Sequence, residues 1–452
     1  MRHSLYVQNH FGAKLFDICT IDNYNKTNRK EEPMMKKVYL CIDLKTFFAS
    51  VECSERHLDP FKTNLVVADP TRGNGALCLA ITPQMKSMGI HNRCRIFEIP
   101  KGVEYITAMP RMHLYMEYSA RIYRIYCRYV SPDDIHVYSI DECFIDITSY
   151  MHLYHKSAKE FAKMLMQAVF ADTHITATCG IGTNLYLAKV ALDIISKHTK
   201  ENIGILDEER YQKYLWHHLP ITDFWHMGSG TANHLLKLGV VDMHGITQIP
   251  EEILYKEFGI NAEYIIDHAW GREPATIASI KKYRPKNESI NNSQVLFSDY
   301  EYEDAILVVK EMVELNVLRL VESRLVTNHI SLYIGYSRTD GGGWSGGSRK
   351  LTVRTNSLSV LMDAFISIYH LKVQKGRLIR QISISFGDVL DEAYESYDLF
   401  SNIEALEEEK KLQKAIVSIR HKYGKNAILK LMNKQEKATT EKRNTLIGGH
   451  NA

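Results

Sequence analysis

Residues 135–148, Ile-His-Val-Tyr-Ser-Ile-Asp-Glu-Cys-Phe-Ile-Asp-Ile-Thr, form the stretch that decides the fold. Apolar and β-branched residues on both sides of Asp141-Glu142 predict two short strands, with the acidic pair at the tip between them. Upstream, residues 37–44 (Lys-Val-Tyr-Leu-Cys-Ile-Asp-Leu) predict a buried strand, and Asp43 stands near its end. We therefore expect three carboxylates at the ends of neighbouring strands.

The elements around this stretch alternate in a way that is typical of one small domain type. The first strand, 37–44, is followed by a helix, by the two strands around Asp141-Glu142, and by a second helix and a final strand. Beyond the strands already given, the elements are expected at 111–130, 158–170, 175–181 and 184–196. This β-α-β-β-α-β order is the ferredoxin-like arrangement. A second αβ set, with a helix at 301–327, strands at 329–337, 347–355 and 378–386 and a helix at 359–369, predicts another domain. The predicted fold class is α/β (α+β), multidomain.

Composition excludes several classes of protein. The chain has 452 residues, 45% apolar and 24% charged, which is ordinary for a soluble protein of several domains. No run is apolar enough to cross a bilayer and no secretory signal is present, so we expect a cytoplasmic protein without membrane association. No two of the eight cysteines form a C-x-x-C pair, so free, reduced thiols are expected. Between Arg319 and Arg380, ten Lys/Arg stand against three Asp/Glu, which suits a polyanion as well as a merely solvated face.

The three carboxylates carry the chemistry. Asp43, Asp141 and Glu142 would repel one another at one sheet edge unless cations neutralise them. Oxygen ligands of this kind suit Mg²⁺, and two such ions, for which Mn²⁺ can substitute, support in-line phosphoryl transfer. Either acidic motif alone is more often an ordinary surface acid at a strand end. Together, on this topology, they predict a catalytic site.

Three sequence blocks resemble the signature motifs of the Y-family (UmuC/DinB-like) DNA polymerases. They are Asp43-Leu-Lys-Thr-Phe-Phe-Ala-Ser-Val-Glu52, Tyr138-Ser-Ile-Asp-Glu-Cys-Phe-Ile-Asp146 and Gly180-Ile-Gly-Thr-Asn-Leu-Tyr-Leu-Ala-Lys189. Their order and spacing match the family over roughly residues 37–386. The Gly-Gly-His ending and the Thr-Pro finger segment resemble its Gram-positive UmuC/UvrX-like branch. The resemblance implies a template-directed, low-fidelity polymerase for lesion bypass in DNA repair and an SOS-type damage response.

The resemblance assigns roles to individual residues. Asp43, Asp141 and Glu142 match the metal ligands, and the backbone carbonyl of Leu44 matches a further metal contact. The expected nucleotide-binding residues are Phe47, Phe48, Thr82, Lys86 and Lys197. Phe48 matches the steric gate under the sugar, and Phe47 is either its companion or a core residue. Lys86 and Lys197 match the cations that hold the triphosphate, although the segment before Lys197 is one residue longer than usual.

One departure from the family pattern concerns the fingers. An Asn-Tyr pair often precedes the first triphosphate cation, and Thr82-Pro83 stand there instead. The tyrosine contact to phosphate is therefore lost, and we expect Thr82 to supply a substitute.

DNA contacts are expected in two regions. Residues 222–240 resemble the helix-hairpin-helix of the family's thumb, where backbone N–H groups at Gly228 and Gly230 suit a DNA phosphate. A turn that merely connects two helices is the alternative. In the second αβ domain, which resembles the family's little finger, four basic residues are expected to track the duplex backbone: Arg338, Arg349, Lys350 and Arg354. Trp344 lies in a Gly-rich loop, 341–347, and receives no role.

The tail carries a candidate partner motif. Ser396-Tyr-Asp-Leu-Phe400 resembles a degenerate clamp-binding peptide, in which Tyr397, Leu399 and Phe400 would fill an apolar groove on a sliding clamp. The leading Gln of that peptide is missing, and a hydrophobic staple for the next helix is the alternative. That helix, 402–423, has no predicted partner within the chain.

These expectations divide the chain as follows: an extension that is disordered or lies upstream of a true start at Met34 or Met35, 1–36; palm, 37–46 and 101–205; fingers, 47–100; thumb, 206–275; linker, 276–289; little finger, 290–388; charged tail, 389–452. The expected partners of a monomeric enzyme are primer-template DNA, dNTP and a sliding clamp, with a recombinase filament or an accessory subunit as further candidates. Two other functions stay open: a non-catalytic DNA-binding regulator on the same scaffold, and a nucleotidyl cyclase.

Overall fold

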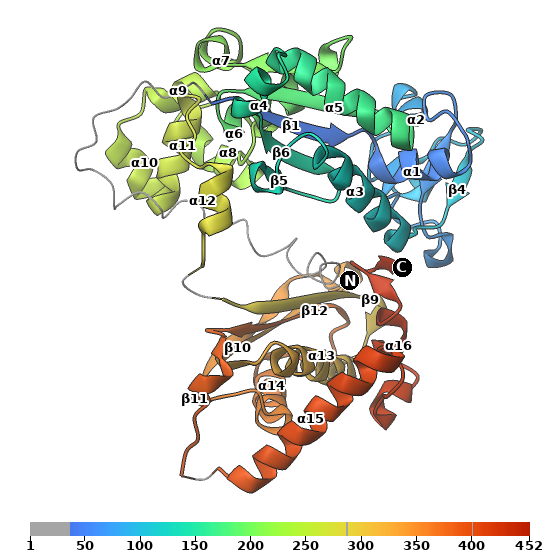
Figure 1. Ribbon diagram of the computed structural model, residues 1–452. Helices are drawn as coiled ribbons and strands as arrows, with labels where there is room; N and C mark the ends of the chain where they lie inside the picture. Colours follow the sequence, from blue (N-terminus) through green and yellow to red (C-terminus); the bar gives the residue numbers. More distant parts are fainter. Residues whose placement is uncertain (1–36, 286–287, 400) are drawn as a thin grey trace. The chain divides into compact units, whose positions relative to one another are not determined.

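The chain is described by a computed structural model that covers residues 37–285, 288–399 and 401–452 (Figure 1). It forms two compact units, one ending at Tyr283 and the other beginning at Arg284. The extension at 1–36, and with it the predicted start at Met34 or Met35, lies outside the described residues. Among the described helices, none is long and apolar enough to cross a membrane.

A five-stranded sheet forms the centre of the N-terminal unit. Its strand order is β5-β6-β1-β7-β8, and the bounds are β1 (Tyr39–Leu44), β5 (Ile135–Val137), β6 (Glu142–Asp146), β7 (Ala177–Gly182) and β8 (Ile203–Leu206). The first four strands have the order and antiparallel pairing of a ferredoxin-like sheet, which confirms the predicted fold class. The sequence analysis missed β8, which pairs parallel with β7 at the edge of the sheet.

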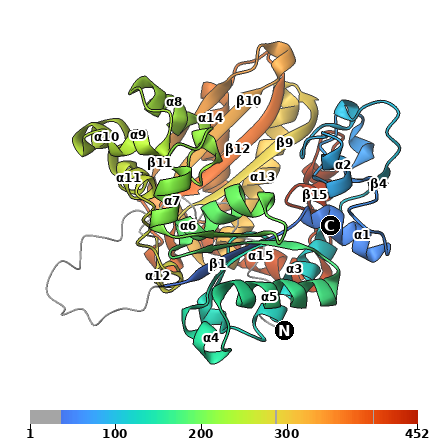
Figure 2. The ribbon, with the colours of Figure 1, turned by 90° about the horizontal axis from the view of Figure 1, so that it is seen from above.

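The two faces of this sheet are covered differently. Helices α3 (Met112–Tyr126) and α5 (Ala158–Thr173) pack on one face, while α6 (Leu185–Val190) lies on the other (Figure 2). Gly180 and Gly182 on β7 make this second contact possible, because a Cβ at either position would lie within 2.2 Å of the backbone of Ala188. The close approach explains the Gly-Ile-Gly block in physical terms.

A small second sheet builds the fingers. Its order is β3-β2-β4, from β2 (Leu65–Val67), β3 (Ala80–Ile81) and β4 (Ile106–Ala108), and α2 (Pro83–Ser87) follows β3 directly. The predicted boundary at residue 100 is therefore too early, because β4 pairs with β2 in this sheet. Helix α1 (Phe47–Glu55), which we had assigned to the fingers, buries its apolar side chains in the main core beneath the palm sheet.

Short helices make up the thumb, as predicted. They are α7 (Glu208–Leu215), α8 (Ser229–Lys237), α9 (Met243–Thr247), α10 (Glu251–Phe258) and α11 (Ala262–Ala269), and they share one apolar core. The predicted linker at 276–289 is partly wrong, because α12 (Ile277–Lys282) is a capped helix. Ile277 is buried against the palm with Tyr39 and Phe144.

The C-terminal unit has a four-stranded antiparallel sheet with the order β11-β10-β12-β9. Its strands are β9 (Ile290–Tyr300), β10 (Leu325–Tyr336), β11 (Trp344–Thr355) and β12 (Ile379–Gly387), and helices α13 (Tyr302–Glu322) and α14 (Leu358–Lys372) cover one face. The edge strand β9 was not predicted from the sequence; polar residues, Asn291–Gln294, fill its first half. Trp344 begins β11, and this corrects its placement in a loop.

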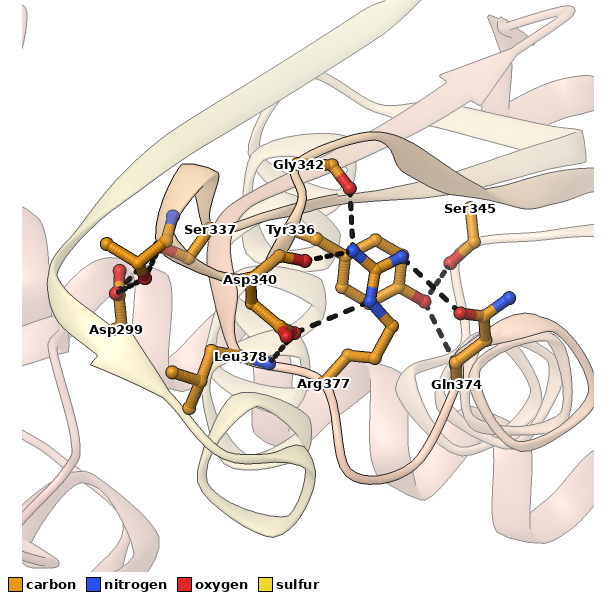
Figure 3. Close-up of polar contacts among 10 residues, drawn as sticks. Asp299, Tyr336, Ser337, Asp340, Gly342, Ser345, Gln374, Arg377 and Leu378 are labelled. Atoms are coloured by element: carbon orange, nitrogen blue, oxygen red, sulfur yellow. Dashed lines mark hydrogen bonds and ion pairs between the residues drawn. The ribbon is translucent and has the colours of Figure 1, made fainter.

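The turn between β10 and β11 is held from one side by Arg377 (Figure 3). Its guanidinium carbon lies 4.0 Å from the centre of the Tyr336 ring, and its Nη2 donates to the carbonyl oxygens of Asp340 (2.5 Å) and Gly342 (2.7 Å). Asp340 also accepts from the backbone N–H of Leu378 at 2.9 Å. Because Arg377 supplies these contacts, the glycine-rich turn has a fixed shape.

The tail belongs to the C-terminal unit, and our expectation that its helix lacks a partner is wrong. Helix α15 (Ile403–Tyr423) packs along α13, and its Glu409 accepts hydrogen bonds from Ser357 Oγ (2.6 Å) and Ser359 N (2.8 Å) at the start of α14. Further on, α16 (Thr440–Arg443) also contacts α13. The charged tail therefore packs onto the C-terminal unit through α15 and α16.

One buried carboxylate joins the end of the tail to α13. Glu311, which is fully buried, accepts hydrogen bonds from Asn433 Nδ2 (3.0 Å), Thr439 N (2.7 Å), Thr439 Oγ1 (3.0 Å) and Thr440 N (3.2 Å). A buried carboxylate is stable when such donors satisfy its oxygens. Glu311 thus fixes the position of residues 433–440.

Replacing Glu311 by Ala is expected to loosen the tail. The change leaves buried donors without an acceptor, which costs about 2–4 kcal/mol. Hydrogen-exchange mass spectrometry of peptides from 425–445 measures this as faster exchange. Glu322→Ala is the matched control, because Glu322 also lies on α13 and contacts the tail residue His421, but as an exposed ion pair worth at most about 1 kcal/mol. Equal effects of the two variants would contradict this role.

Candidate active site

Strand pairing brings the three predicted carboxylates together. Asp43 lies opposite Glu142 in the antiparallel pair β1–β6, so both side chains are on the same face of the sheet. The backbone N–H of Leu44 donates to the carbonyl oxygen of Asp141 at 3.0 Å, which holds the turn beside the end of β1. Asp141 Oδ1 accepts from Ser139 Oγ at 2.6 Å. The site therefore lies at one end of the palm sheet, as predicted.

Like charges and burial act on these groups. The pKa of Asp43 is raised to about 8, first by loss of hydration and then by the neighbouring charges of Asp141 and Glu142. Burial also raises the pKa of Glu142, although Lys189 and the Cys41 thiol oppose this effect. Three acids in this position need positive charge close by.

Lys189 provides the protein's own part of that charge. Its Nζ lies 2.9 Å from Glu142 Oε1 and 3.1 Å from Asp193 Oδ2, and the side chain is almost entirely buried. Cys41 Sγ donates to the same Glu142 oxygen at 3.0 Å. The acidic neighbours hold the pKa of Lys189 above its usual value, although loss of hydration acts in the opposite direction. Lys189 is shared between Glu142 and Asp193. The charges of Asp43 and Asp141 therefore still need a cation to balance them.

The donor set fits divalent cations. Carboxylate oxygens from Asp43, Asp141 and Glu142, with the carbonyl group of Leu44 beside them, are hard ligands of the kind that Mg²⁺ prefers. Burial first, and then the charges of Asp141 and Glu142, raise the pKa of Asp43, and a bound cation would oppose both effects. These residues could therefore hold magnesium.

Phe48 has a rigid support. Its ring stacks on Tyr115 with 4.6 Å between centroids and 20° between planes. The Tyr115 hydroxyl donates to Glu52 at 2.8 Å, and Arg111 holds the same carboxylate through two hydrogen bonds, of 2.9 and 2.7 Å. Phe47, in contrast, is buried in the palm core, which favours the packing interpretation over the predicted nucleotide contact.

Lysines gather near the carboxylates. The pKa of Lys86 is lowered by loss of hydration and by the like charges of Lys197 and Lys45, whereas Asp43 acts in the opposite direction. Lys86, one of the two predicted triphosphate cations, thus lies within electrostatic reach of both Asp43 and Lys197. The helix before Lys197 includes a π-helical turn, Ala191–Ile195, which accommodates one extra residue. The π-helical turn therefore accounts for the extra residue in the sequence before Lys197.

Thr82 has a different role from the one predicted. Its side chain is fully buried, and its hydroxyl donates to the carbonyl oxygen of Thr63 (2.7 Å) and accepts from the N–H of Leu65 (3.2 Å). This geometry argues against a phosphate contact. Thr82 instead anchors the start of α2 to the strand β2.

The thumb glycines are open to solvent. Gly228 is the N-cap of α8, no side chain caps this helix, and no atom lies within 4 Å of a Cβ built at Gly228 or Gly230. The backbone N–H groups of the first turn are therefore accessible. The element before this turn is only a 3-10 turn, Ile221–Asp223, so the first helix of the predicted hairpin is very short.

The four basic residues of the C-terminal unit do not share one surface. Arg349 pairs with Ile330 and points to the helix-covered face, while Lys350 pairs with His329 on the open face. Arg354 donates to the carbonyl oxygen of Asp388 at 2.6 Å, so its guanidinium is used within the unit. Arg338 is exposed in the turn after β10.

Uncharged side chains dominate the open face. One row across the four strands contains Gly346, Tyr333, Ser383 and Ser293, and the next contains Ser348, Ser331, Ser385 and Asn291. Hydroxyl and amide groups of this kind can donate to and accept from a polar surface without charge. The surface is thus less basic than the local composition predicts.

The predicted clamp motif is partly visible. Leu399 is fully exposed, which argues against a hydrophobic staple formed by this residue, and Tyr397 donates to Glu395 at 3.0 Å. Phe400 lies outside the described residues.

Sequence reasoning missed several residues of this site. Tyr115, Glu52 and Arg111 support Phe48, but they come from two helices and no spacing rule links them. Lys189 ended the third sequence block but received no role. Its place in an apolar helix, next to small residues, was the available signal.

Comparisons with known proteins agree with this geometry. The model described as "impB/mucB/samB family" matches residues 42–193, and that of the family's C-terminal domain matches 287–399. The chain is 31% identical over 419 residues to the "Putative UV-damage repair protein UvrX" of Bacillus subtilis, covering 92% of this chain and 98% of that protein. It is 27% identical over 425 residues to "DNA polymerase IV 2" of the same organism, covering 92% and 99%.

A solved structure has the same fold. A Y-family DNA polymerase chimera of Dbh and Dpo4 superposes with a TM-score of 0.60 at 19% identity, covering 78% of this chain and 99% of the chimera.

Proposed function

This chain belongs to the Y-family (UmuC/DinB-like, or impB/mucB/samB) of DNA polymerases, and we propose that it extends primers across damaged templates with low fidelity. The role lies in DNA repair and an SOS-type damage response. The observation that carries the proposal is the meeting of Asp43, Asp141 and Glu142 at one end of the palm sheet, with Lys86 and Lys197 nearby.

Two magnesium ions would supply activation of the primer 3′-hydroxyl and neutralisation of the leaving pyrophosphate. The chain's own residues prepare this site. Asp43, Asp141 and Glu142 offer the oxygen ligands, with the carbonyl group of Leu44 beside them. Lys189, 2.9 Å from Glu142, favours the ionised form of this buried carboxylate. Lys86 and Lys197 attract the triphosphate as point charges.

Primer-template DNA is the proposed second substrate. The accessible N–H groups at Gly228 and Gly230 suit a phosphate, and Arg338 and Lys350 offer positive charge on the C-terminal unit. On the same C-terminal unit, the hydroxyl-rich open face offers uncharged groups for hydrogen bonds to DNA. Such contacts carry little sequence information, as a polymerase for any template requires.

Replacing Asp141 by Asn is expected to abolish primer extension in the presence of Mg²⁺. Removing one ligand charge costs several kcal/mol of transition-state stabilisation, which lowers the rate more than about a hundredfold. Asp133→Asn is the control, since this exposed acid lies in the 3-10 turn before β5. It should retain wild-type rates in the same gel assay.

This assay also tests the alternatives. A wild type without extension on varied primers and metals would support a DNA-binding regulator. Formation of a cyclic nucleotide without a primer would support a cyclase. The coarser assignment to the polymerase family does not depend on either result.

Selection of the sugar is proposed to rest on Phe48. Stacking on Tyr115 restricts the ring to one position, and the network of Glu52 and Arg111 fixes Tyr115 in turn. A ribonucleotide's 2′-hydroxyl would collide with a ring that cannot move aside.

Phe48→Ala is expected to raise the use of ribonucleotides relative to deoxynucleotides by roughly ten- to a hundredfold, because one such steric contact is worth about 1–3 kcal/mol. The ratio of kcat/KM values on an undamaged template measures this. Tyr115→Ala should raise the ratio less, by loosening the ring. Tyr115→Phe keeps the stacked ring and is the control; an equal rise in that variant would contradict the stacking role.

A sliding clamp is the proposed protein partner. Leu399 is fully exposed directly before Phe400, as a residue that inserts into an apolar groove would be. A pull-down by the clamp should recover wild type but not the variant Leu399→Ala/Phe400→Ala. Leu431→Ala, which changes another exposed leucine of the tail, is the control. Equal recovery of all three proteins would exclude the motif.

A further inference from the structure

Three side chains with metal-binding groups meet in the thumb, in a position that the polymerase reaction does not use. They are His217, Asp242 and His244, and one potential ligand atom from each lies within 4.8 Å of the other two. His217 follows the end of α7, whereas Asp242 and His244 stand at the start of α9. Within the described part of the chain, no other three His, Cys, Asp or Glu side chains have ligand atoms this close together, those of Asp43, Asp141 and Glu142 included.

The backbone fixes the two segments relative to each other. The N–H of His244 donates to the carbonyl oxygen of Trp216 at 3.1 Å. Trp216 is itself held, because its indole Nε1 donates to the carbonyl oxygen of Ala269 at 2.8 Å. His217 and His244 therefore approach each other on supported backbone.

Asp242 is fixed in a way that directs one oxygen toward the histidines. Its Oδ1 accepts from the N–H of Gly245 at 2.7 Å as the cap of α9, and its Oδ2 lies 2.8 Å from His217 Nδ1. A Cβ at position 245 would lie 3.2 Å from Oδ1, so glycine gives this carboxylate room. The cap holds the side chain, and the second oxygen is available as a ligand.

His244 distinguishes this cluster from a simple ion pair. Its ring lies 4.9 Å from that of His217 and 5.0 Å from that of Trp216, between centroids. Elsewhere in the thumb, His218 pairs with Asp223 at 2.9 Å and His234 pairs with Glu257, and neither pair has a third ligand. A hydrogen-bonded His–Asp pair is complete with two residues, whereas a bound metal ion would gain a further ligand from a second histidine.

We propose that His217, Asp242 and His244 bind one divalent transition-metal ion of the Zn²⁺ class. Two imidazoles and a carboxylate suit Zn²⁺, with water as the fourth ligand, and do not suit Mg²⁺, which prefers oxygen. Ligand atoms around tetrahedral zinc lie about 3.3 Å apart, given bonds of about 2.0–2.1 Å. The ligand atoms of this cluster lie within 4.8 Å of one another, and binding of the ion would bring them to this spacing by rotation of the side chains.

The ion would brace the thumb. It would join the segment after α7 to the start of α9, and both segments border the apolar core that contains Leu215, Met243 and Ile246. An ion that binds only the folded state stabilises it by mass action. The site thus acts on the stability of the thumb and not on the chemistry at the palm.

Isothermal titration of the untagged full-length protein with ZnCl₂, in a large excess of Mg²⁺ to occupy the carboxylate site, tests the proposal. We expect one Zn²⁺ per chain in the wild type and loss of this binding in His217→Ala/His244→Ala. Asp242→Asn keeps an oxygen to cap α9 but removes the charged ligand, and should weaken binding more than about tenfold. Hydrogen exchange in peptides that span 216–217 and 242–247 should slow on adding Zn²⁺ in the wild type alone.

His218→Ala is the matched control, because His218 is the adjacent histidine with its own carboxylate partner. It should bind Zn²⁺ as the wild type does. Zinc binding of equal stoichiometry and affinity in the double variant, or no zinc-dependent protection in the wild type, would overturn the proposal. Circular dichroism of each variant confirms that a lost signal does not come from an unfolded thumb.

Discussion

The close contact between β7 and α6 is the constraint on which the catalytic site depends. Gly180 and Gly182 have no side chains, so the helix backbone approaches the strand to a distance that a Cβ would block. This approach carries Lys189, on α6, to within 2.9 Å of Glu142. A buried carboxylate without a partner is costly, whereas one that shares a cation stays ionised. The two glycines of the third sequence block therefore determine which charge lies beside Glu142, a residue of the second block.

A second network controls the shape of the site. Phe48 directly follows the buried Phe47 on α1; its ring lies 5.7 Å from that of Phe47, between centroids, and stacks on Tyr115. Glu52, one turn further along the same helix, binds the hydroxyl of that tyrosine. Helix α1 thus supplies both the gate and the acid that fixes its support. The proposed selection of the nucleotide sugar and the packing of α1 therefore depend on the same residues, Phe48, Tyr115 and Glu52.

Much of this site could be predicted from sequence because strand periodicity fixes it. Asp43, Asp141 and Glu142 end or begin strands whose apolar residues are unambiguous, and antiparallel pairing leaves one way to bring them together. The sequence left Phe47 open between a core residue and a companion of the gate, and it suggested a phosphate contact for Thr82, because burial depends on the tertiary fold. A threonine at a helix start is usually a surface cap, but here the chain at Thr63 and Leu65 covers it.

The C-terminal unit shows where composition misleads. Ten basic residues in one stretch predict a positive surface, but the alternation of β11 sends Arg349 and Lys350 to opposite faces, and Arg354 is bonded within the unit. The β9 strand was missed because its polar residues resemble a linker, although two residues of the strand, Leu296 and Tyr300, are buried. The tail was misjudged for a similar reason. Charged residues of the tail, Glu409 and Lys410 among them, bind partners within the C-terminal unit. The buried end of the tail is held by Glu311 of α13, and nothing in the sequence distinguishes this residue from the other acids of that helix. Charge in a sequence indicates solvent only when no partner exists in the fold. In this unit the partners come from residues up to 151 positions away, as in the bond from Arg443 to Asn292.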